Sequence, residues 1–214
     1  MPLNLSPEEA RVLGSLIEKD MATPEYYPLS VNALTNACNQ KSNRDPMVNY
    51  SDDVVRHALE CLRDRNLLSV LTGGDNRVPK YGHRAPETLN INNRELSLIC
   101  VLLLRGPQTL AELKTRTERM YDFGDLDAVE NCLGRLAERG MAMQLPKLPG
   151  TREPRWMHLL AGEVDVASLE STAPDAAAAA APRHDMLLDR VAKLEMDLEQ
   201  LRAEFMQFRK QFDG

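Results

Sequence analysis

The chain has 214 residues, of which 43% are hydrophobic and 5% aromatic, and it carries a formal net charge of −6 at pH 7. This length and apolar content allow one or two compact domains with hydrophobic cores. The longest uninterrupted apolar run, Leu98 to Leu104, is far too short to cross a bilayer, so a membrane-spanning helix is excluded.

The cysteines and the N-terminus indicate a reducing compartment. Cys38, Cys61, Cys100 and Cys132 are isolated, without the close spacing of a metal site or a disulfide framework. The first nine residues have neither the basic nor the apolar region of a signal peptide. We therefore expect a cytoplasmic protein that uses no metal and no cofactor, binds no membrane and shows no evident small-molecule substrate.

The negative charge is concentrated near the C-terminus. Residues 1–90 carry a net charge of −2, residues 91–162 carry +1, and residues 163–214 carry −5. The part of the chain that can form a core is thus nearly neutral. Net charge therefore neither requires nor excludes a polyanionic partner.

The first predicted helix begins at a strong N-terminal signal. Ser6 at the N-cap is followed by Pro7 at the first helical position and by Glu9 three residues after the cap. Apolar residues then recur at helical spacing on one face. The helix should end before Pro24, and the two prolines in segment 23–28 favour an extended conformation there.

Two further helices and a hairpin complete the first 88 residues. Ser30 and Ser51 are the predicted N-caps of the second and third helices. Two short β-like runs, 67–71 and 77–81, flank a glycine-rich turn and predict a hairpin. Three helices followed by a hairpin are the elements of a winged helix.

The same order of elements recurs in residues 89–162. Four apolar positions of the first helix recur 86 residues later, Ser30 recurs as Thr109 after 79 residues, and the apolar positions of the third helix recur after 74 residues. Asn92 or Asn93 and Asp125 are the other predicted caps of this copy. Because the offset falls stepwise, the first copy carries insertions before and after its second helix. We predict an α+β, mostly helical fold with two tandem winged-helix domains, 1–88 and 89–162.

The last 52 residues differ in character. Residues 163–182 contain a six-alanine run between two prolines and predict a linker. In residues 183–214, apolar residues alternate steps of four and three, which indicates a coiled-coil helix. Its seam is formed by Leu187, Val191, Leu194, Leu198, Leu201, Phe205 and Phe208. The flanking charges are complementary in a parallel dimer, so we predict a homodimer through this helix. The alternative is a helix that folds back on its own domain.

The insertion after the second helix is a polar stretch with almost no apolar residue. Its side chains supply hydrogen-bond donors and acceptors that can pair with the edges of nucleic-acid bases and with phosphates. The candidate contact residues are Asn39, Gln40, Lys41, Ser42, Asn43 and Arg44. The equally weighted alternative is a scaffold whose hydrogen bonds hold the long insertion against the domain.

Long motifs in the chain resemble a known bacterial family. They include Glu18-Lys19, Thr23-Pro24, Tyr27-Pro28-Leu29-Ser30, the whole segment Ala37 to Pro46, and Leu104-Arg105-Gly106-Pro107-Gln108-Thr109. Over about residues 5–161 the chain resembles the YceH-like family of uncharacterised proteins. The resemblance implies a tandem winged-helix fold, and it implies no activity, substrate or catalytic residue. Leu110 departs from the family pattern, where proline is expected.

Double-stranded DNA is the first candidate partner, because winged helices commonly place the third helix in the major groove. Arg77, Lys80 and Arg84 in the first hairpin could then contact the backbone, although solvated loop cations are the simpler interpretation. Carboxylates on both predicted third helices oppose this hypothesis, since phosphate repels them.

A dimeric protein-binding adaptor without nucleic-acid binding is the alternative, and function does not follow from fold. The two hypotheses differ in where Lys41 and Arg44 lie. One basic face with the hairpin cations favours nucleic acid, and dispersal favours the adaptor. No sequence motif of a hydrolase, metalloenzyme or nucleotide-binding enzyme occurs, so we expect no catalytic residues.

Overall fold

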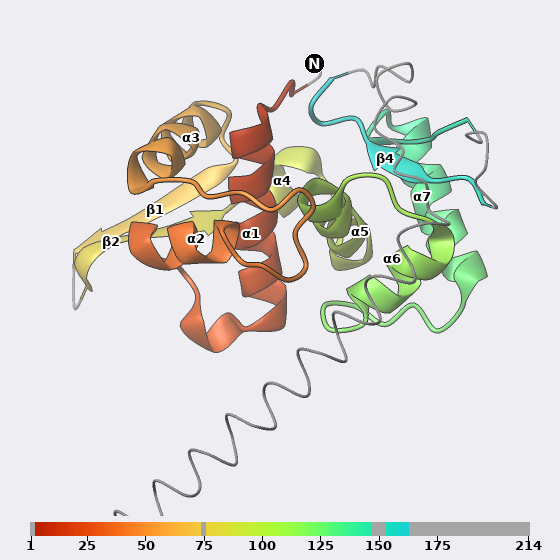
Figure 1. The fold of residues 1–214 in the computed structure, drawn as a ribbon, viewed down its shortest axis with the longest axis horizontal. Helices are drawn as coiled ribbons and strands as arrows, with labels where there is room; N and C mark the ends of the chain where they lie inside the picture. Colours follow the sequence, from red (N-terminus) through yellow and green to blue (C-terminus); the bar gives the residue numbers. More distant parts are fainter. Residues whose placement is uncertain (1–2, 74–75, 147–152, 163–214) are drawn as a thin grey trace, which may run out of the picture. The chain divides into compact units, whose positions relative to one another are not determined.

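The computed structural model describes residues 3–73, 76–146 and 153–162, and the structural statements below concern these residues (Figure 1). The predicted linker, 163–182, and the predicted coiled coil, 183–214, lie outside the described residues. The same is true of all seven predicted seam residues. Self-association through the C-terminal helix therefore stays a prediction.

The described chain is α+β, with helices and two small antiparallel sheets. The first repeat contains α1 (Pro7–Ala22), the 3-10 helix η1 (Pro24–Tyr26), α2 (Val31–Cys38), α3 (Asp52–Asp64), β1 (Leu68–Gly73) and β2 (Asn76–His83). A short helix, α4 (Ala85–Leu89), follows. The second repeat contains α5 (Asn93–Arg105), α6 (Leu110–Thr117), α7 (Leu126–Glu138), β3 (Ala142–Gln144) and β4 (Trp156–His158). We use "first repeat" and "second repeat" in this sense throughout.

The predicted N-caps are confirmed in both repeats. In each case the side-chain oxygen accepts a hydrogen bond from the backbone N–H three residues later, which satisfies one of the free donors of the first turn. The caps are Ser6, Ser30, Ser51, Asn92, Thr109 and Asp125. The start of each long helix is thus set by local chemistry that the sequence displays.

Two local predictions were wrong or incomplete. Segment 23–28 was expected to be extended, but Pro24–Tyr26 forms the 3-10 helix η1 and only the residues after it are extended. Proline restricts the residue before it and is itself well placed at the first position of a helical turn, so Pro24 begins η1. The short helix α4 was not anticipated.

Each hairpin is extended by one residue from the segment before the second helix of its repeat. β1 and β2 pair antiparallel, and Leu29 forms a bridge with Tyr81 of β2. In the second repeat, β3 pairs with β4, and Gln108 bridges to Trp156 of β4. The two sheets therefore share one topology, although β1 and β2 are longer than β3 and β4.

The first helices of the two repeats pack against each other at the centre of the described chain. Nine consecutive residues of α1, from Glu9 to Ile17, are buried, as are ten of α5, from Glu95 to Leu104. A helix buried on all sides needs partners around its whole circumference. α1 and α5 obtain them because α2 and α3 cover α1, α6 and α7 cover α5, and the two helices contact each other. One hydrophobic cluster consequently runs through both repeats.

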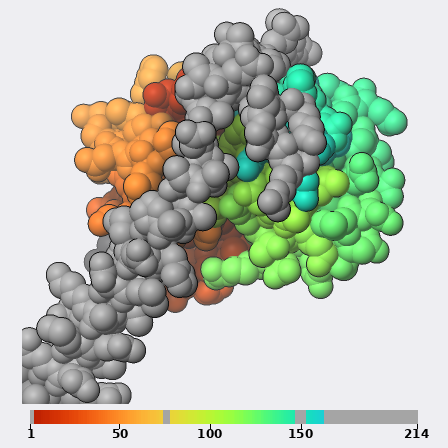
Figure 2. Space-filling model, turned by 45° about the vertical axis from the view of Figure 1, so that its right-hand side comes forward, coloured from red at the N-terminus to blue at the C-terminus, as the bar shows by residue number. Residues whose placement is uncertain are grey.

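The contact between α1 and α5 depends on a glycine. A Cβ atom at Gly14 would lie 2.9 Å from Cγ of Leu104 and 3.1 Å from Cβ of Leu103. The Cys100 thiol lies 3.4 Å from the carbonyl oxygen of Gly14, to which it donates a hydrogen bond. The absence of a side chain at this position therefore sets how closely the two helices approach. Figure 2 shows the first repeat, in red to orange, and the second, in green to cyan, on opposite sides of the view.

We predict that Gly14→Ala lowers the free energy of unfolding by about 1–3 kcal/mol, because the added methyl group overpacks the helix contact. Gly134→Ala is the matched control, since a Cβ at that helical glycine meets nothing within 4 Å. This control should be neutral or should stabilise by about 0.5–1 kcal/mol through helix propensity. Urea unfolding of both variants measures the difference. Equal stability of the two variants would contradict the role assigned to Gly14.

Candidate functional site

Arg44, a candidate contact residue, lies inside the protein. Its guanidinium is fully buried and forms two parallel hydrogen bonds with the carboxylate of Glu18 on α1, at 2.6 and 3.1 Å. Nε and Nη2 also donate to the carbonyl oxygen of Ala37 in the last turn of α2, at 3.1 and 2.9 Å. Arg44 thereby satisfies a free carbonyl at the helix C-terminus and neutralises a half-buried carboxylate. For this residue the geometry favours the scaffold interpretation.

A second buried arginine, Arg11, also binds the same loop. Nη1 of Arg11 on α1 donates to the carbonyl of Cys38 at 3.2 Å, and Nη2 donates to the carbonyl of Pro46 at 2.6 Å. Further along, the side-chain amide of Asn39 donates to the carbonyl of Tyr50, and its oxygen accepts from the Tyr50 N–H, each at 2.8 Å. The insertion is therefore closed across its base by side chains.

The polar stretch also connects the two repeats. The backbone N–H of Asp45 donates to the carbonyl of Leu104 at the end of α5, at 2.9 Å. Nη1 of Arg105 donates to the side-chain oxygen of Asn43 at 2.8 Å. Asn43 has a positive φ of 58°, a conformation that asparagine tolerates better than most residues. The stretch therefore binds the C-terminal ends of both α2 and α5.

Of the remaining candidate residues in this loop, one belongs to the scaffold and two are exposed and free to contact a partner. Gln40 accepts hydrogen bonds from Arg44 and Lys19, so its side chain belongs to the scaffold. Lys41 and Ser42 are exposed. The insertion thus presents a short exposed tip on a base of internal hydrogen bonds.

The structure describes the side chains of two of the three candidate contact residues in the first hairpin. Lys80 is half-buried on β2, Arg84 is exposed before α4, and the side chain of Arg77 is outside what the structure describes. No hydrogen bond or ion pair within the described part of the chain joins Lys80 or Arg84 to the polar stretch. Arg155, the basic residue of the second hairpin whose side chain is described, donates to Glu112 at 3.1 Å and to the carbonyl of Pro107 at 2.9 Å.

The exposed faces of the third helices are acidic in both repeats. On α3 the exposed charged residues are Asp52, Asp53, Arg56, Glu60, Arg63 and Asp64. On α7 they are Asp127, Glu130, Arg135 and Glu138. Carboxylates outnumber arginines on each face, and the charged residues in the first turn of both helices are all carboxylates. This composition stabilises the helix N-termini and repels phosphate.

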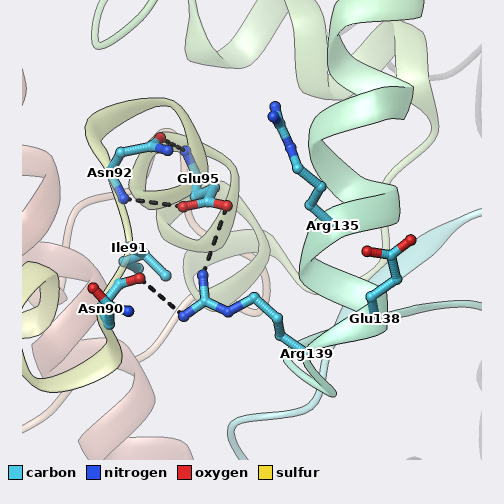
Figure 3. Close-up of a pocket in the computed structure, with 7 residues that line it drawn as sticks. All are labelled: Asn90, Ile91, Asn92, Glu95, Arg135, Glu138 and Arg139. Atoms are coloured by element: carbon cyan, nitrogen blue, oxygen red, sulfur yellow. Dashed lines mark hydrogen bonds and ion pairs between the residues drawn. The ribbon is translucent and has the colours of Figure 1, made fainter.

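The two repeats contain equivalent cavities beside the N-terminus of their first helices. One, of about 600 Å³, is lined by Asn90, Ile91, Asn92, Glu95, Arg135, Glu138 and Arg139 (Figure 3). The other, of about 760 Å³, is lined by Asn4, Leu5, Ser6, Glu8, Glu9, Asp53, Val54, His57, Ala58, Cys61 and Arg65. Asn4, Leu5, Ser6 and Glu9 correspond to Asn90, Ile91, Asn92 and Glu95 at the offset of 86 residues.

A Glu–Arg ion pair, which we call a clamp, is part of the lining of each cavity. Glu9 closes the capping box of α1 and lies 3.4 Å from Nε of Arg65, which follows α3. Glu95 closes the capping box of α5 and lies 3.7 Å from Nη1 of Arg139, which follows α7. Figure 3 shows Arg139 reaching from the end of α7 to both Glu95 and the backbone of Asn90.

The two clamps also share their backbone contacts and backbone conformation. Arg65 donates to the carbonyl of Leu3, and Arg139 donates to the carbonyls of Leu89 and Asn90. Asn4 and Asn90 both adopt positive φ, 50° and 52°. Sequence reasoning missed this pair of clamps, although the offsets that define the repeats also relate their residues. Because the same arrangement occurs twice, we interpret both cavities as by-products of a structural device.

The cavity of the first repeat is lined by a thiol, Cys61, and its counterpart has Arg135 at the equivalent position. The sulfur of Cys61 lies 3.9 Å from Nε2 of His57, one turn earlier on α3. Desolvation and the nearby Glu9 carboxylate raise the pKa of the Cys61 thiol. Burial likewise raises the pKa of Cys38 and Cys132. A thiol that stays protonated is a poor nucleophile, so the geometry provides no activated cysteine here.

The described residues form neither a metal site nor a membrane-spanning helix. Among residues 3–73, 76–146 and 153–162, no group of three or more His, Cys, Asp or Glu side chains is arranged to hold a metal ion. None of the helices described is long and apolar enough to cross a membrane.

Comparison with known proteins gives the family of the chain. A family model described as "Protein of unknown function, DUF480" matches residues 5–151. A UPF0502 protein of Solibacter usitatus is 47% identical over 213 residues, covering 100% of both chains. Those of Geobacter sulfurreducens and Geotalea daltonii are 48% and 51% identical, over 94% and 83% of this chain and 91% and 82% of their own. The chain belongs to this family of uncharacterised bacterial proteins.

We predict that Arg44→Met destabilises the protein by about 3–5 kcal/mol, because it leaves a half-buried carboxylate without its partner. Lys41→Met, three residues earlier and exposed, is the matched control and should change stability by about 0.5 kcal/mol or less. Chemical unfolding at neutral pH measures both. A loss below about 1 kcal/mol for Arg44→Met would show that the buried ion pair is not required.

The ion pair should also make stability depend on pH. Burial alone would raise the pKa of Glu18, but the hydrogen bonds and charge of Arg44 hold it below the ordinary value of 4.5. A carboxyl group with a lowered pKa stabilises the fold above its unfolded-state pKa, and this stabilisation is lost as pH falls. The wild type should therefore exceed Glu18→Gln in unfolding free energy at pH 7. The difference should shrink as pH falls below about 4.5. A pH-independent difference would contradict this assignment.

Proposed function

We propose that each repeat is a winged helix and that the protein is a non-catalytic adaptor that binds another protein. Both repeats have the order of three helices and a hairpin, and in each the hairpin is bridged by one residue, Leu29 or Gln108, that precedes the second helix. This order matches the winged-helix arrangement that the sequence repeats predict.

The observation that carries the adaptor proposal is the acidity of both third helices. In a winged helix that binds DNA, the third helix enters the major groove and its exposed face lies between phosphates. Here that face would bring Asp52 and Asp53, or Asp127, close to the phosphate backbone. Each carboxylate would lose hydration and gain repulsion, so DNA affinity would fall. A protein partner with basic or neutral groups meets no such penalty.

The placement of Arg44 supports the same proposal. A basic face that joins Lys41, Arg44 and the hairpin cations would favour nucleic acid. Arg44 instead directs its charge inward to Glu18, so it contributes no positive potential to an exposed face. The exposed tip of the polar stretch then retains a single cation, Lys41, among residues 39–44.

DNA binding is the second candidate, and one observation favours it. Lys41 and Ser42 are exposed next to Asn43 on a loop whose base is fixed by internal hydrogen bonds. A pre-organised polar tip can contact phosphate with little loss of conformational entropy. Such a contact would give salt-dependent binding with few phosphate neutralisations.

The adaptor proposal predicts discrete protein contacts at the third helices. A photo-reactive amino acid placed at Glu60 on α3, or at Glu130 on α7, should crosslink to a defined protein in cells that express the full chain. The same amino acid at Thr115, exposed on α6, is the control for random encounters. Crosslinking at neither helix above the level of Thr115 would contradict the proposal.

Fluorescence anisotropy with a pool of duplex DNA separates the two candidates. We expect the full-length protein not to bind DNA at physiological salt. Glu60→Lys should raise DNA affinity only by non-specific electrostatic attraction. Salt-dependent binding that Lys41→Glu weakens would instead support DNA contact through the polar stretch, since each lost phosphate contact lowers the salt slope by about 1.

A further inference from the structure

One edge of the first hairpin is open, and its backbone orientation follows from the bridge to Leu29. The N–H and carbonyl of Tyr81 on β2 bond to the carbonyl and N–H of Leu29, at 2.8 and 3.0 Å. In an antiparallel sheet both backbone groups of a residue point to the same neighbour. Val70, which pairs with Tyr81, therefore directs its own N–H and carbonyl away from β2. No strand of the described chain pairs with that edge of β1.

The open strand is unusually apolar for an exposed edge. Val70 and Leu71 on β1 are 41% and 45% exposed, and Val78 on β2 is 52% exposed. All six residues of β1, Leu68 to Gly73, are uncharged. Proteins commonly protect exposed edge strands with charged residues, because open backbone groups invite pairing with another strand. β1 has no such charge.

The second hairpin provides an internal comparison. Gln144 of β3 pairs with Trp156, which bonds through both backbone groups to Gln108. Gln144 therefore occupies the position equivalent to Val70, with its backbone groups also directed outward. At this site the second repeat has a polar side chain on a strand of only three residues. An apolar residue at this outward-directed position is thus found in the first repeat and not in the second.

We propose that β1 pairs with β1 of a second copy of this chain, antiparallel, with the twofold axis at Val70. The two Val70 residues would exchange their N–H and carbonyl groups as a hydrogen-bonded pair. Leu68 would face Thr72 of the other copy, and Ser69 would face its Leu71. The two hairpins would thereby form one continuous four-stranded sheet.

A second copy fits this edge because the pairing is self-complementary. A twofold axis at Val70 places position 70 of one copy against position 70 of the other, so a charge at that position would meet a like charge. The uncharged segment 68–72 avoids this repulsion and places Val70 against Val70. This contact is separate from the predicted coiled coil and does not depend on the proposed adaptor function.

Amide hydrogen exchange of the full-length protein tests the pairing at a single residue. In an isolated hairpin the outward N–H groups of Val70 and Gln144 would both exchange freely. In the proposed dimer the Val70 N–H should exchange more slowly than that of Gln144, by about tenfold or more at high protein concentration. Equal, fast exchange at both positions would overturn the proposal, whatever the oligomeric state of the C-terminal helix.

A charge-swap pair provides the second measurement. Val70→Glu and Val70→Lys each place like charges on the twofold axis, so each variant alone should lose protection at position 70. An equimolar mixture should regain it, because opposite charges then face each other. Gln144→Glu is the matched control and should leave Val70 protected. Folded variants whose mixture shows no regained protection would overturn the proposal, and so would Val70→Glu that stays as protected as the wild type.

Discussion

The close approach of α1 and α5 at Gly14 is the constraint on which the rest of the structure depends. Because no side chain separates the helices there, leucines of α5 pack directly on the α1 backbone, and the Cys100 thiol reaches the Gly14 carbonyl. Residues 9–17 of α1 and 95–104 of α5 are consequently buried on all sides of the helix. This packing accounts for the apolar run 98–104, all of whose residues are buried.

The polar stretch between α2 and α3 serves that same central packing. It contains almost no apolar residue, yet Arg44 and Asp45 connect it to α1 and to the end of α5. Buried cations with several hydrogen-bond partners specify one loop conformation, because any displacement leaves charged groups unpaired. A conspicuous polar motif can therefore be a structural component, even though its tip, which includes Lys41 and Ser42, is exposed.

The sequence predicted what local chemistry determines. The caps at Ser30 and Thr109 were correct because a hydroxyl before a helix satisfies its own first turn. The burial of Arg44 was not predictable, since it requires Glu18, twenty-six residues away, to face the same interior. The Glu–Arg clamps were missed for the same reason. The position of Val70 on an open edge depended on knowing which way Tyr81 directs its backbone, and the residue pattern does not contain that information.

The clamps have a consequence for the topology of the chain. Arg65 and Arg139 each return the end of a third helix to the start of its own repeat. A similar closure joins the outer ends, because the Leu5 N–H bonds to the carbonyl of Leu160 at 2.8 Å. The two ends of the described chain, near Leu5 and Leu160, are therefore neighbours. Residues 3–162 are therefore suited to circular permutation, since a short peptide could join these two ends while new termini open in a surface loop.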